Sequence, residues 1–339
     1  MRNLNDHKTT HPVPDCRYIA YTESGRTARG LSDRRACLAA LLAEAEASGR
    51  IPILPRFHLN TDHNQGIWLL PSNLLEYVSL SKFANVLSGY VTSDEFHHND
   101  ISSKRVVNGE PASASKDAAE QLVERRWPNG NWWNGLPDTK RRLDEFHGEL
   151  GGHRGWFRPP SYVYEFAKNI ADTIDGNYLG MHIRRRDRLI NNPYLNKATQ
   201  SQAILRRIAP YTGKMRNLYI ATDEQDPRHF DLLRSHYNVF TASNFDCFDT
   251  PELKYNNFLR YAIEMCVVDL ATVSFFTFTN SGHWYDLNVN APCFSVTDYP
   301  KGYVRARVRW IRRIRKFRLL TLASVRRVPS GLASPDRFH

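Results

Sequence analysis

The 339-residue sequence has few cysteines and no long apolar run. Its five cysteines are scattered, without a C-x-x-C pair or zinc-ligand spacing, so they predict no disulfide framework, although one or two bridges stay open. No 18 consecutive residues are apolar, so the sequence predicts no membrane span. The segment 1–14 is polar and contains no apolar signal core. We therefore expect a cytoplasmic or peripheral membrane protein, or one of the secretory lumen if a targeting segment is missing.

The excess positive charge is confined to one end of the chain. The sequence carries 46 Lys and Arg residues against 35 acidic residues, a net charge of +11. Residues 301–339 contain 12 of the basic residues and one acid, which leaves residues 1–300 neutral. Nucleic-acid binding requires a basic surface, so the body of the protein is not expected to bind nucleic acid. Only the tail is basic enough for that role.

Strand-like and helix-like segments alternate along the chain, which predicts an α/β fold with parallel sheets. In the first half we expect a strand at 17–22, a helix at 36–47, a strand at 51–54, and loops and short helices over 93–155. The second half predicts strands at 178–184, 218–222, 239–241 and 275–278, and helices at 162–173, 199–208, 226–236 and 252–271. We predict two Rossmann-like domains, over 1–158 and 159–300, facing a cleft, and a basic amphipathic tail over 301–339.

Two segments pass from an apolar run directly into charged residues. They are Gly180-Met181-His182-Ile183-Arg184-Arg185-Arg186-Asp187 and Leu218-Tyr219-Ile220-Ala221-Thr222-Asp223-Glu224. A buried parallel strand gives this pattern where it ends, and ligands of open α/β sheets bind at that carboxyl edge. Guanidinium groups offer a fork of donors that matches phosphate oxygens. A diphosphate ligand such as a nucleotide-sugar is the first hypothesis.

Four segments resemble motifs of the GDP-fucose-dependent fucosyltransferases, the α1,6-fucosyltransferase and protein O-fucosyltransferase superfamily. His182-x-Arg184-Arg185-x-Asp187 is similar to its H-x-R-R-x-D signature, and 221–224 to its A-T-D-[DE] strand end. Residues 30–35 (Gly-Leu-Ser-Asp-Arg-Arg) resemble its turn after the first strand, with Ser32 in place of Asn. Residues 276–281 (Phe-Thr-Phe-Thr-Asn-Ser) resemble its late turn, without the usual Gly.

The resemblance implies a GT-B-like enzyme that transfers fucose from GDP-fucose with inversion and without a metal cofactor. The sequence has no D-x-D string, the usual signature of a metal-held nucleotide-sugar. The N-terminal domain would bind the acceptor, a peptide or glycan hydroxyl, and the C-terminal domain the donor. Open alternatives are a transferase of this fold that uses another nucleotide-sugar, and a non-catalytic binding protein localised by its tail.

The resemblance also implies donor-site residues, each with a structural alternative. An arginine, Arg184 or Arg185, would bind the β-phosphate; alternatively both pair with carboxylates such as Asp187 or Glu224. His182 would lie near guanine and ribose, or pack between strand and helix. Asp187 would contact the donor or order the arginine loop. Glu264, with Asp269 as second choice, would hold guanine, or face solvent on a helix. The late-turn candidates are Thr277, Thr279, Asn280 and Ser281, which could instead serve ordinary turn chemistry.

The catalytic candidates are Arg185, for the leaving diphosphate, and Asp33, as the general base that removes the acceptor proton. Alternatively, Ser32 or Asp33 is the N-cap of a helix. Trp132 and Trp133 could stack on an acceptor or plug a loop onto the core.

The basic tail has an amphipathic pattern of its own. Within 301–320, Trp310, Ile314 and Phe317 form an apolar stripe at helical spacing beside a cationic face. This pattern suits an anionic membrane surface, and equally a terminal helix that packs on the body.

Overall fold

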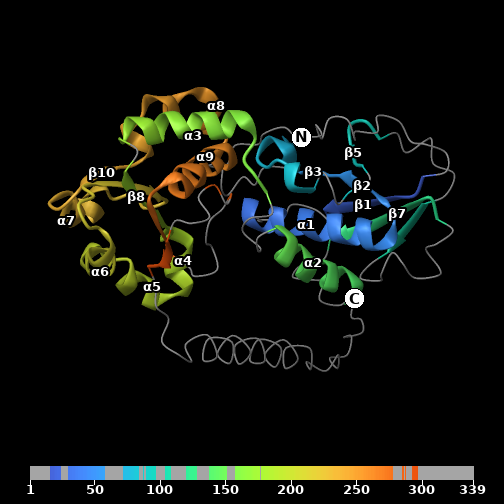
Figure 1. Cartoon of the computed structure of the whole chain (residues 1–339), viewed down its shortest axis with the longest axis horizontal. Coiled ribbons are helices and arrows are strands. Elements are labelled where there is room, and N and C mark those ends of the chain that lie inside the picture. The colour runs from blue at the N-terminus through green and yellow to red at the C-terminus, as the bar shows by residue number, and fades with distance from the viewer. Residues whose placement is uncertain are drawn as a thin grey trace, which may run out of the picture. The chain divides into compact units, whose positions relative to one another are not determined.

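The structure is a computed structural model, and it describes most of the chain up to residue 296 (Figure 1). The described residues are 16–23, 30–57, 72–83, 87, 89–96, 104–107, 120–127, 137–150, 157–175, 177–277, 285, 287 and 292–296. They belong to one compact unit, residues 1–296. The basic tail and the pair Trp132 and Trp133 lie outside the described residues. No helix among those described is long and apolar enough to cross a bilayer.

The first half of the unit is built on a five-stranded sheet with strand order β5-β2-β1-β7-β6. Every neighbouring pair in it is parallel. The strands are β1 (Tyr18–Glu23), β2 (Ile51–Leu54), β5 (Val91–Thr92), β6 (Lys104–Val107) and β7 (Leu122–Trp127), and a separate two-stranded sheet pairs β3 (Arg56–Phe57) with β4 (Ser72–Asn73). The strands β1 and β2 lie where the sequence predicts them, and the parallel α/β class is confirmed.

The prediction of loops and short helices over 93–155 was wrong. That stretch contains β6, β7 and the 14-residue helix α2 (Pro137–Leu150). Strand β7 pairs with β1 inside the sheet, yet its sequence, Leu-Val-Glu-Arg-Arg-Trp, has no apolar run. Its buried Arg125 donates to both carboxylate oxygens of Glu44 on α1 (Leu31–Ser48), and the Tyr21 hydroxyl donates to the same carboxylate. A buried ion pair thus gives an interior strand a polar sequence.

Helix α1 is longer than predicted and is buried on almost every side. It begins at Leu31, so that Gly30 is its N-cap and Ser32 and Asp33 belong to its first turn. The interpretation of Ser32 or Asp33 as an N-cap was therefore wrong. Residues 37–45 of the helix are all buried, rather than one face of it. This explains why that part of the sequence is apolar all round. Gly49 ends the helix in the left-handed conformation, with φ of 62°.

The second half is built on a parallel five-stranded sheet with strand order β10-β9-β8-β11-β12. Its strands are β8 (Tyr178–Ile183), β9 (Asn217–Thr222), β10 (Asn238–Phe240), β11 (Val273–Phe276) and β12 (Cys293–Ser295). In chain order this is 3-2-1-4-5, a doubly wound arrangement. The order of the strands reverses between β8 and β11. Ligands of such sheets bind at this switch point, outside the carboxyl ends of the strands.

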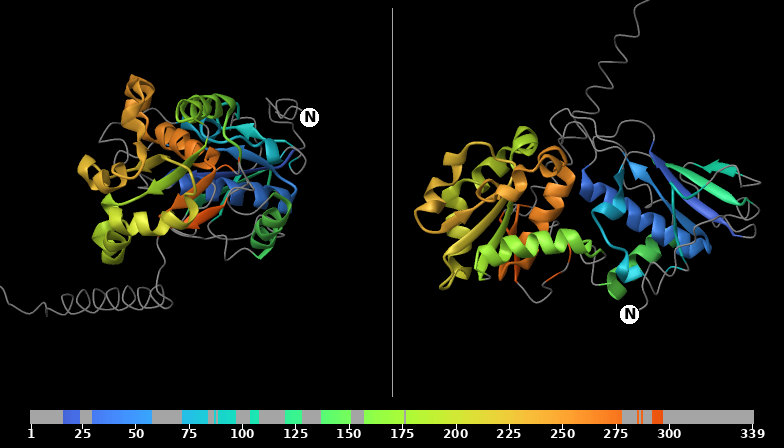
Figure 2. Two further views of the ribbon diagram at one scale, coloured as in Figure 1. Left: turned by 60° about the vertical axis from the view of Figure 1, so that its left-hand side comes forward. Right: turned by 90° about the horizontal axis from the view of Figure 1, so that it is seen from above.

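Helices cover both faces of the second sheet (Figures 1 and 2). Alternate residues of β8 belong to two apolar clusters, one shared with α3 (Ser161–Thr173) and α9 (Asn257–Leu270), the other with α6 (Ser201–Ile208) and α7 (Asp231–Arg234). The remaining helices are α4 (Arg186–Asn191), α5 (Pro193–Ala198) and α8 (Pro251–Tyr255). The single helix predicted over 252–271 is interrupted at Asn256, whose side chain accepts from the Leu259 amide and caps α9.

Side chains of the two halves also contact each other. The Tyr285 hydroxyl donates to the Tyr77 carbonyl oxygen at 2.7 Å, and the Asn256 amide donates to the Tyr77 hydroxyl at 3.2 Å. One apolar cluster includes residues of both α1 and α9. The predicted division of the body at residue 158 stays a prediction, because both sheets lie in one compact unit.

Candidate functional site

The carboxyl ends of β8 and β11 are joined by a threonine. The Thr277 hydroxyl follows β11, donates to the His182 carbonyl oxygen at 2.8 Å and accepts from the Arg184 amide at 2.8 Å. Thr277 and its hydroxyl are fully buried. This link fixes the point at which the chain leaves β8. The signature arginines therefore emerge at the switch point of the sheet.

Arg185 is buried and is held by the protein through every nitrogen of its guanidinium group. Its Nε donates to Glu224 at 2.6 Å, its Nη2 to the side-chain oxygen of Asn196 at 3.0 Å, and its Nη1 to Thr199. Its backbone amide donates to Asp223 Oδ1 at 2.6 Å. Pairing with Glu224, one of the two interpretations left open by the sequence, is what the structure shows. Arg185 thus connects β8 to the end of β9 and to α5.

Glu224 is correspondingly ionised. Burial raises the pKa of this carboxyl, but hydrogen bonds from the Asp226 amide, from Arg185 and from the Gln225 amide outweigh it and lower the pKa below its usual value. The ion pair with Arg185 therefore persists under mildly acidic conditions and keeps the ends of β8 and β9 together.

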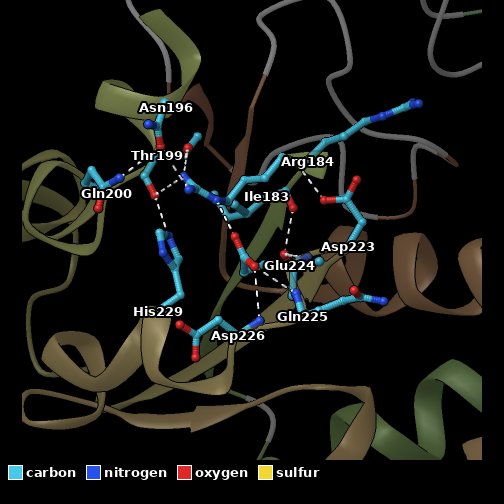
Figure 3. Close-up of polar contacts among 12 residues, drawn as sticks. Ile183, Arg184, Asn196, Thr199, Gln200, Asp223, Glu224, Gln225, Asp226 and His229 are labelled. Atoms are coloured by element: carbon cyan, nitrogen blue, oxygen red, sulfur yellow. Dashed lines mark hydrogen bonds and ion pairs between the residues drawn. The ribbon is translucent and has the colours of Figure 1, made fainter. Parts of the chain in front are cut away.

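The Arg184 side chain points away from that of Arg185, and Figure 3 shows it extending away from the cluster around Glu224. Strand alternation predicts this division, because Arg184 shares the face of His182 whereas Arg185 lies on the other face. The charge of Arg184 acts on both His182 and Tyr261, which lie on the α9 side of the sheet. Of the two arginines, Arg184 is thus the one directed toward His182 and α9.

His182 is a neutral histidine at the end of β8. It is 9% exposed, and its Nδ1 has no hydrogen-bond partner among the described residues. Its ring meets those of Tyr261 and Phe276 edge-on, with centroids 5.7 Å and 6.2 Å away. Burial, with the charge of Arg184, lowers its pKa to about 4. The orphaned nitrogen of a neutral imidazole can hydrogen-bond a bound ligand.

Glu264 lies on α9 and is buried at 8% exposure, so the alternative interpretation, a solvent-facing helix acid, is wrong. Its Oε2 forms an ion pair with Arg260 Nε, 3.9 Å away. Burial raises its pKa to about 7; Arg260 opposes the rise and Asp223 adds to it. A buried carboxyl of this kind suits a ligand that brings two N–H donors, because such donors stabilise the ionised form.

Asp269, the second choice for that role, is fully buried and accepts a hydrogen bond from the Tyr285 backbone amide. It therefore holds the backbone of Tyr285.

The first turn of α1 contributes to the same region. The Ser32 side chain is hydrogen-bonded to the hydroxyl of Tyr261 on α9, and the charge of Arg35 also acts on that hydroxyl. In a parallel α/β sheet a helix that follows a strand begins at the carboxyl edge, and one that precedes a strand also has its N-terminus there. Hence α1, after β1, and α9, before β11, bring their first turns to the strand ends.

Several predicted residues lie outside what the structure describes. Asp33 is in α1 and Asp187 is in α4, but their side chains lie outside the described residues, as do Thr279, Asn280 and Ser281 entirely. Their roles stay predictions. Among the residues that are described, no group of three His, Cys, Asp or Glu residues is placed to hold a metal ion.

Asp223 and Tyr261 were not predicted as site residues from the sequence. Asp223 belongs to the A-T-D-E segment quoted above, and its Oδ1 accepts from the Arg185 amide beside Glu264. Tyr261 lies three residues before Glu264, a spacing that places both on one helix face. Once Glu264 was chosen, that spacing could have identified Tyr261.

No protein-family model matches the chain, and no curated protein matches its sequence. Solved structures resemble its fold. POFUT1 in complex with GDP has a TM-score of 0.50 and 14% identity over 84% of this chain and 99% of that one. POFUT1 in complex with GDP-fucose has a TM-score of 0.50 and 14% identity, over 84% of this chain and 98% of that one. The fucosyltransferase NodZ from Bradyrhizobium has a TM-score of 0.47 and 12% identity, over 82% of this chain and 94% of that one. The fold is therefore similar to that of POFUT1 and is GT-B-like, as predicted.

Proposed function

We propose that this protein is a glycosyltransferase that binds GDP-fucose at the carboxyl edge of the second sheet and transfers fucose to a hydroxyl group. The observation that carries the proposal is that Arg184 and neutral His182 lie at the switch point of that sheet, where His182 packs on Tyr261, one turn before buried Glu264 on α9. The fold is similar to that of POFUT1, whose structures contain GDP and GDP-fucose, and this likeness supports the choice of ligand.

The base of the nucleotide would bind at Glu264. Guanine presents a ring N–H and an exocyclic amine on one edge, and a carboxylate accepts from both. Adenine and uracil lack this pair of adjacent donors. His182 Nδ1, which has no partner among the described residues, would meet the ribose or the base.

The diphosphate would bind at Arg184 and the turn after β11. Arg184 offers planar donors, and the late-turn residues Thr279, Asn280 and Ser281 would add hydroxyl, amide and backbone donors. Thr277, whose hydroxyl is engaged with β8, would hold that turn in place. Arg185 would position Arg184 rather than bind phosphate, because its guanidinium nitrogens donate to Glu224, Asn196 and Thr199. Asp187 would order the same loop.

The reaction would be a direct displacement with inversion. The acceptor oxygen attacks C1 of fucose, the bond between C1 and the diphosphate oxygen breaks, and GDP leaves with the bonding electron pair. Arg184 would neutralise the charge that develops on the β-phosphate. The acceptor proton would pass to a base, for which Asp33 in the first turn of α1 is the candidate. No metal cofactor is expected, and the acceptor is a peptide or glycan hydroxyl.

A transferase of the same fold that uses another nucleotide-sugar is the second candidate, because an arginine on a diphosphate does not select the sugar. A non-catalytic binding protein is the other alternative, and it would bind no nucleotide-sugar or bind one without turnover. Localisation at a membrane by residues 301–320 remains a separate hypothesis, which vesicle binding with and without the tail would test.

The test is calorimetric titration with GDP, GDP-fucose, GDP-mannose and UDP-GlcNAc in EDTA. We expect GDP and GDP-fucose to bind, and Arg184→Ala to weaken both by about 100-fold, the value of a lost charge-assisted hydrogen bond to phosphate. Arg141→Ala, which removes an exposed arginine of α2, is the matched control and should bind as the wild type does. Release of GDP from GDP-fucose in the presence of acceptor would distinguish the enzyme from a binding protein. Absence of nucleotide binding by a folded sample would refute the proposal.

A further inference from the structure

Tyr261 occupies a central position at the proposed donor site. It lies in the second turn of α9, one turn before Glu264, and its ring meets that of His182 edge-on with centroids 5.7 Å apart. Tyr261 thus contacts one residue assigned to the nucleotide and lies one helical turn from another. Ring packing alone would explain a phenylalanine here, so the hydroxyl group needs its own explanation.

The hydroxyl is held from the other half of the protein. The Ser32 side chain, in the first turn of α1, hydrogen-bonds the Tyr261 hydroxyl. This contact joins the first-half motif at 30–35 to the strand ends of the second sheet. A serine and a tyrosine that form such a pair each keep further hydrogen-bonding capacity, since a hydroxyl both donates and accepts.

Two guanidinium groups also act on this hydroxyl. The charge of Arg184 reaches it from the end of β8, and that of Arg35 from α1. Arg35 is buried between the rings of Phe157 and Tyr285, with its Cζ 5.5 Å from each ring centroid. Positive charge that converges from two directions around the hydroxyl of this half-buried tyrosine favours an anion at that point.

We infer that the Tyr261 hydroxyl donates a hydrogen bond to the diphosphate of the donor, and that Ser32 positions it for this contact. Arg184 and Arg35 supply the positive field, so the two halves of the protein recognise the diphosphate together. The inference rests on the proposed function and extends it to a residue on α9 and a residue on α1. The anion to which it applies is the diphosphate, rather than the base or the sugar.

The first experiment compares the binding of GDP and guanosine to the full chain and to Tyr261→Phe. The variant keeps the ring that packs on His182 and removes only the hydroxyl. We expect GDP to bind at least about tenfold more weakly, because a hydrogen bond to a charged group is lost. Guanosine, which has no phosphate and is measured by displacement, should bind as before. Tyr255→Phe, at an exposed tyrosine of α8, is the matched control and should change neither affinity.

The second experiment tests the positioning role of Ser32. Ser32→Ala should weaken GDP binding less than Tyr261→Phe does, and the double variant should bind no worse than Tyr261→Phe alone, because the two groups act through one contact. Ser32→Thr keeps the hydroxyl and should restore affinity. Melting temperatures identify any variant that has lost its fold.

The outcomes separate this inference from the function on which it rests. If the wild type binds GDP and Tyr261→Phe binds it equally well, the inference is wrong and the donor site stands. An equal loss of affinity for GDP and guanosine would place the role of Tyr261 at the base and would also overturn the inference. A folded wild type that binds no nucleotide would overturn both.

Discussion

The ionisation of Glu264 gives a quantitative test of the site, through the variant Glu264→Gln. Burial raises the pKa of this carboxyl from 4.5 to about 7. The difference corresponds to about 3 kcal/mol between its protonated and ionised forms in the folded protein, relative to the unfolded chain. Glutamine has nearly the same shape and never ionises. The substitution therefore removes the free-energy cost of ionising a buried carboxyl and leaves the packing of α9 largely intact.

The sign of the effect follows from the raised pKa. Below pH 4.5 the group is protonated in the folded and unfolded states, and its stabilising contribution is complete. Between pH 4.5 and about 7 the unfolded chain releases the proton first, so the free energy of unfolding falls as pH rises. Above pH 7 both states are ionised and the loss is constant. Glu264→Gln should lack this decline and gain up to about 3 kcal/mol on the wild type between pH 4.5 and 8.

Nucleotide binding should show the opposite trend. The carboxyl must be ionised to accept from both N–H donors of guanine, and a group with a pKa of about 7 is mostly protonated at pH 6 and mostly ionised at pH 8. The affinity of the wild type for guanosine should therefore rise about tenfold over that range. Glu264→Gln should bind guanosine weakly at every pH, because its amide presents a donor to one of the guanine donors.

The assays are urea unfolding and calorimetric binding of wild type and Glu264→Gln at pH 5, 6, 7 and 8. Guanosine is used because the phosphates of GDP titrate in the same range. Equal pH dependence of unfolding in the two proteins would show that Glu264 ionises normally and would refute the burial argument. A rise in stability with a loss of guanosine binding would support the assignment of the base.

Three further predictions concern the frame that holds the site. Gly180→Ala should destabilise the protein by about 1–3 kcal/mol in urea unfolding, because the new Cβ would lie 2.7 Å from the Ala271 Cβ and from a backbone oxygen of α9. Glu44→Gln should cost about 3–5 kcal/mol by leaving buried Arg125 without its carboxylate, and Glu44→Gln combined with Arg125→Met should cost less than Glu44→Gln alone. Asn256→Ala should lower stability by about 1 kcal/mol in the same assay, through loss of the α9 cap.

The sequence predicts β8, β9 and β11 of the second sheet because these strands are mostly buried and therefore apolar, whereas the partly buried β12 was not predicted. Strand β8 is buried at all six positions, and its predicted bounds were right to within one residue. The first sheet was predicted only where the same condition holds, at β1 and β2. Strand β7 was missed because Glu124 and Arg125 are buried through polar partners, which no hydrophobic pattern can indicate.

The sequence indicated which residues lie near the strand ends, but not which contacts they make. Strand ends, and the first turns of the helices connected to them, come together by topology, so His182, Arg184, Arg185, Glu264 and Thr277 could be named as candidates from the sequence, and their roles in binding stay predictions. The partners of Arg185 could not be chosen in the same way. Glu224 was one of two carboxylates considered. Glu224 apart, the partners are Asn196 in the short helix α5 and Thr199 at its C-cap, whereas the sequence predicted a helix only from residue 199 onward.

The adjacent arginines Arg184 and Arg185 place one guanidinium group in the structural frame and direct the other to the candidate site. Because side chains alternate across a strand, Arg184 and Arg185 leave β8 on opposite faces. Arg185 meets Asn196, Thr199 and Glu224, which together engage its guanidinium nitrogens and hold β8 against β9. Arg184 is directed to the side of His182 and Tyr261, where its charge can act on a ligand. Loss of Arg185 should therefore lower stability and loosen the loop that carries Arg184, whereas loss of Arg184 should lower affinity in a protein that still folds.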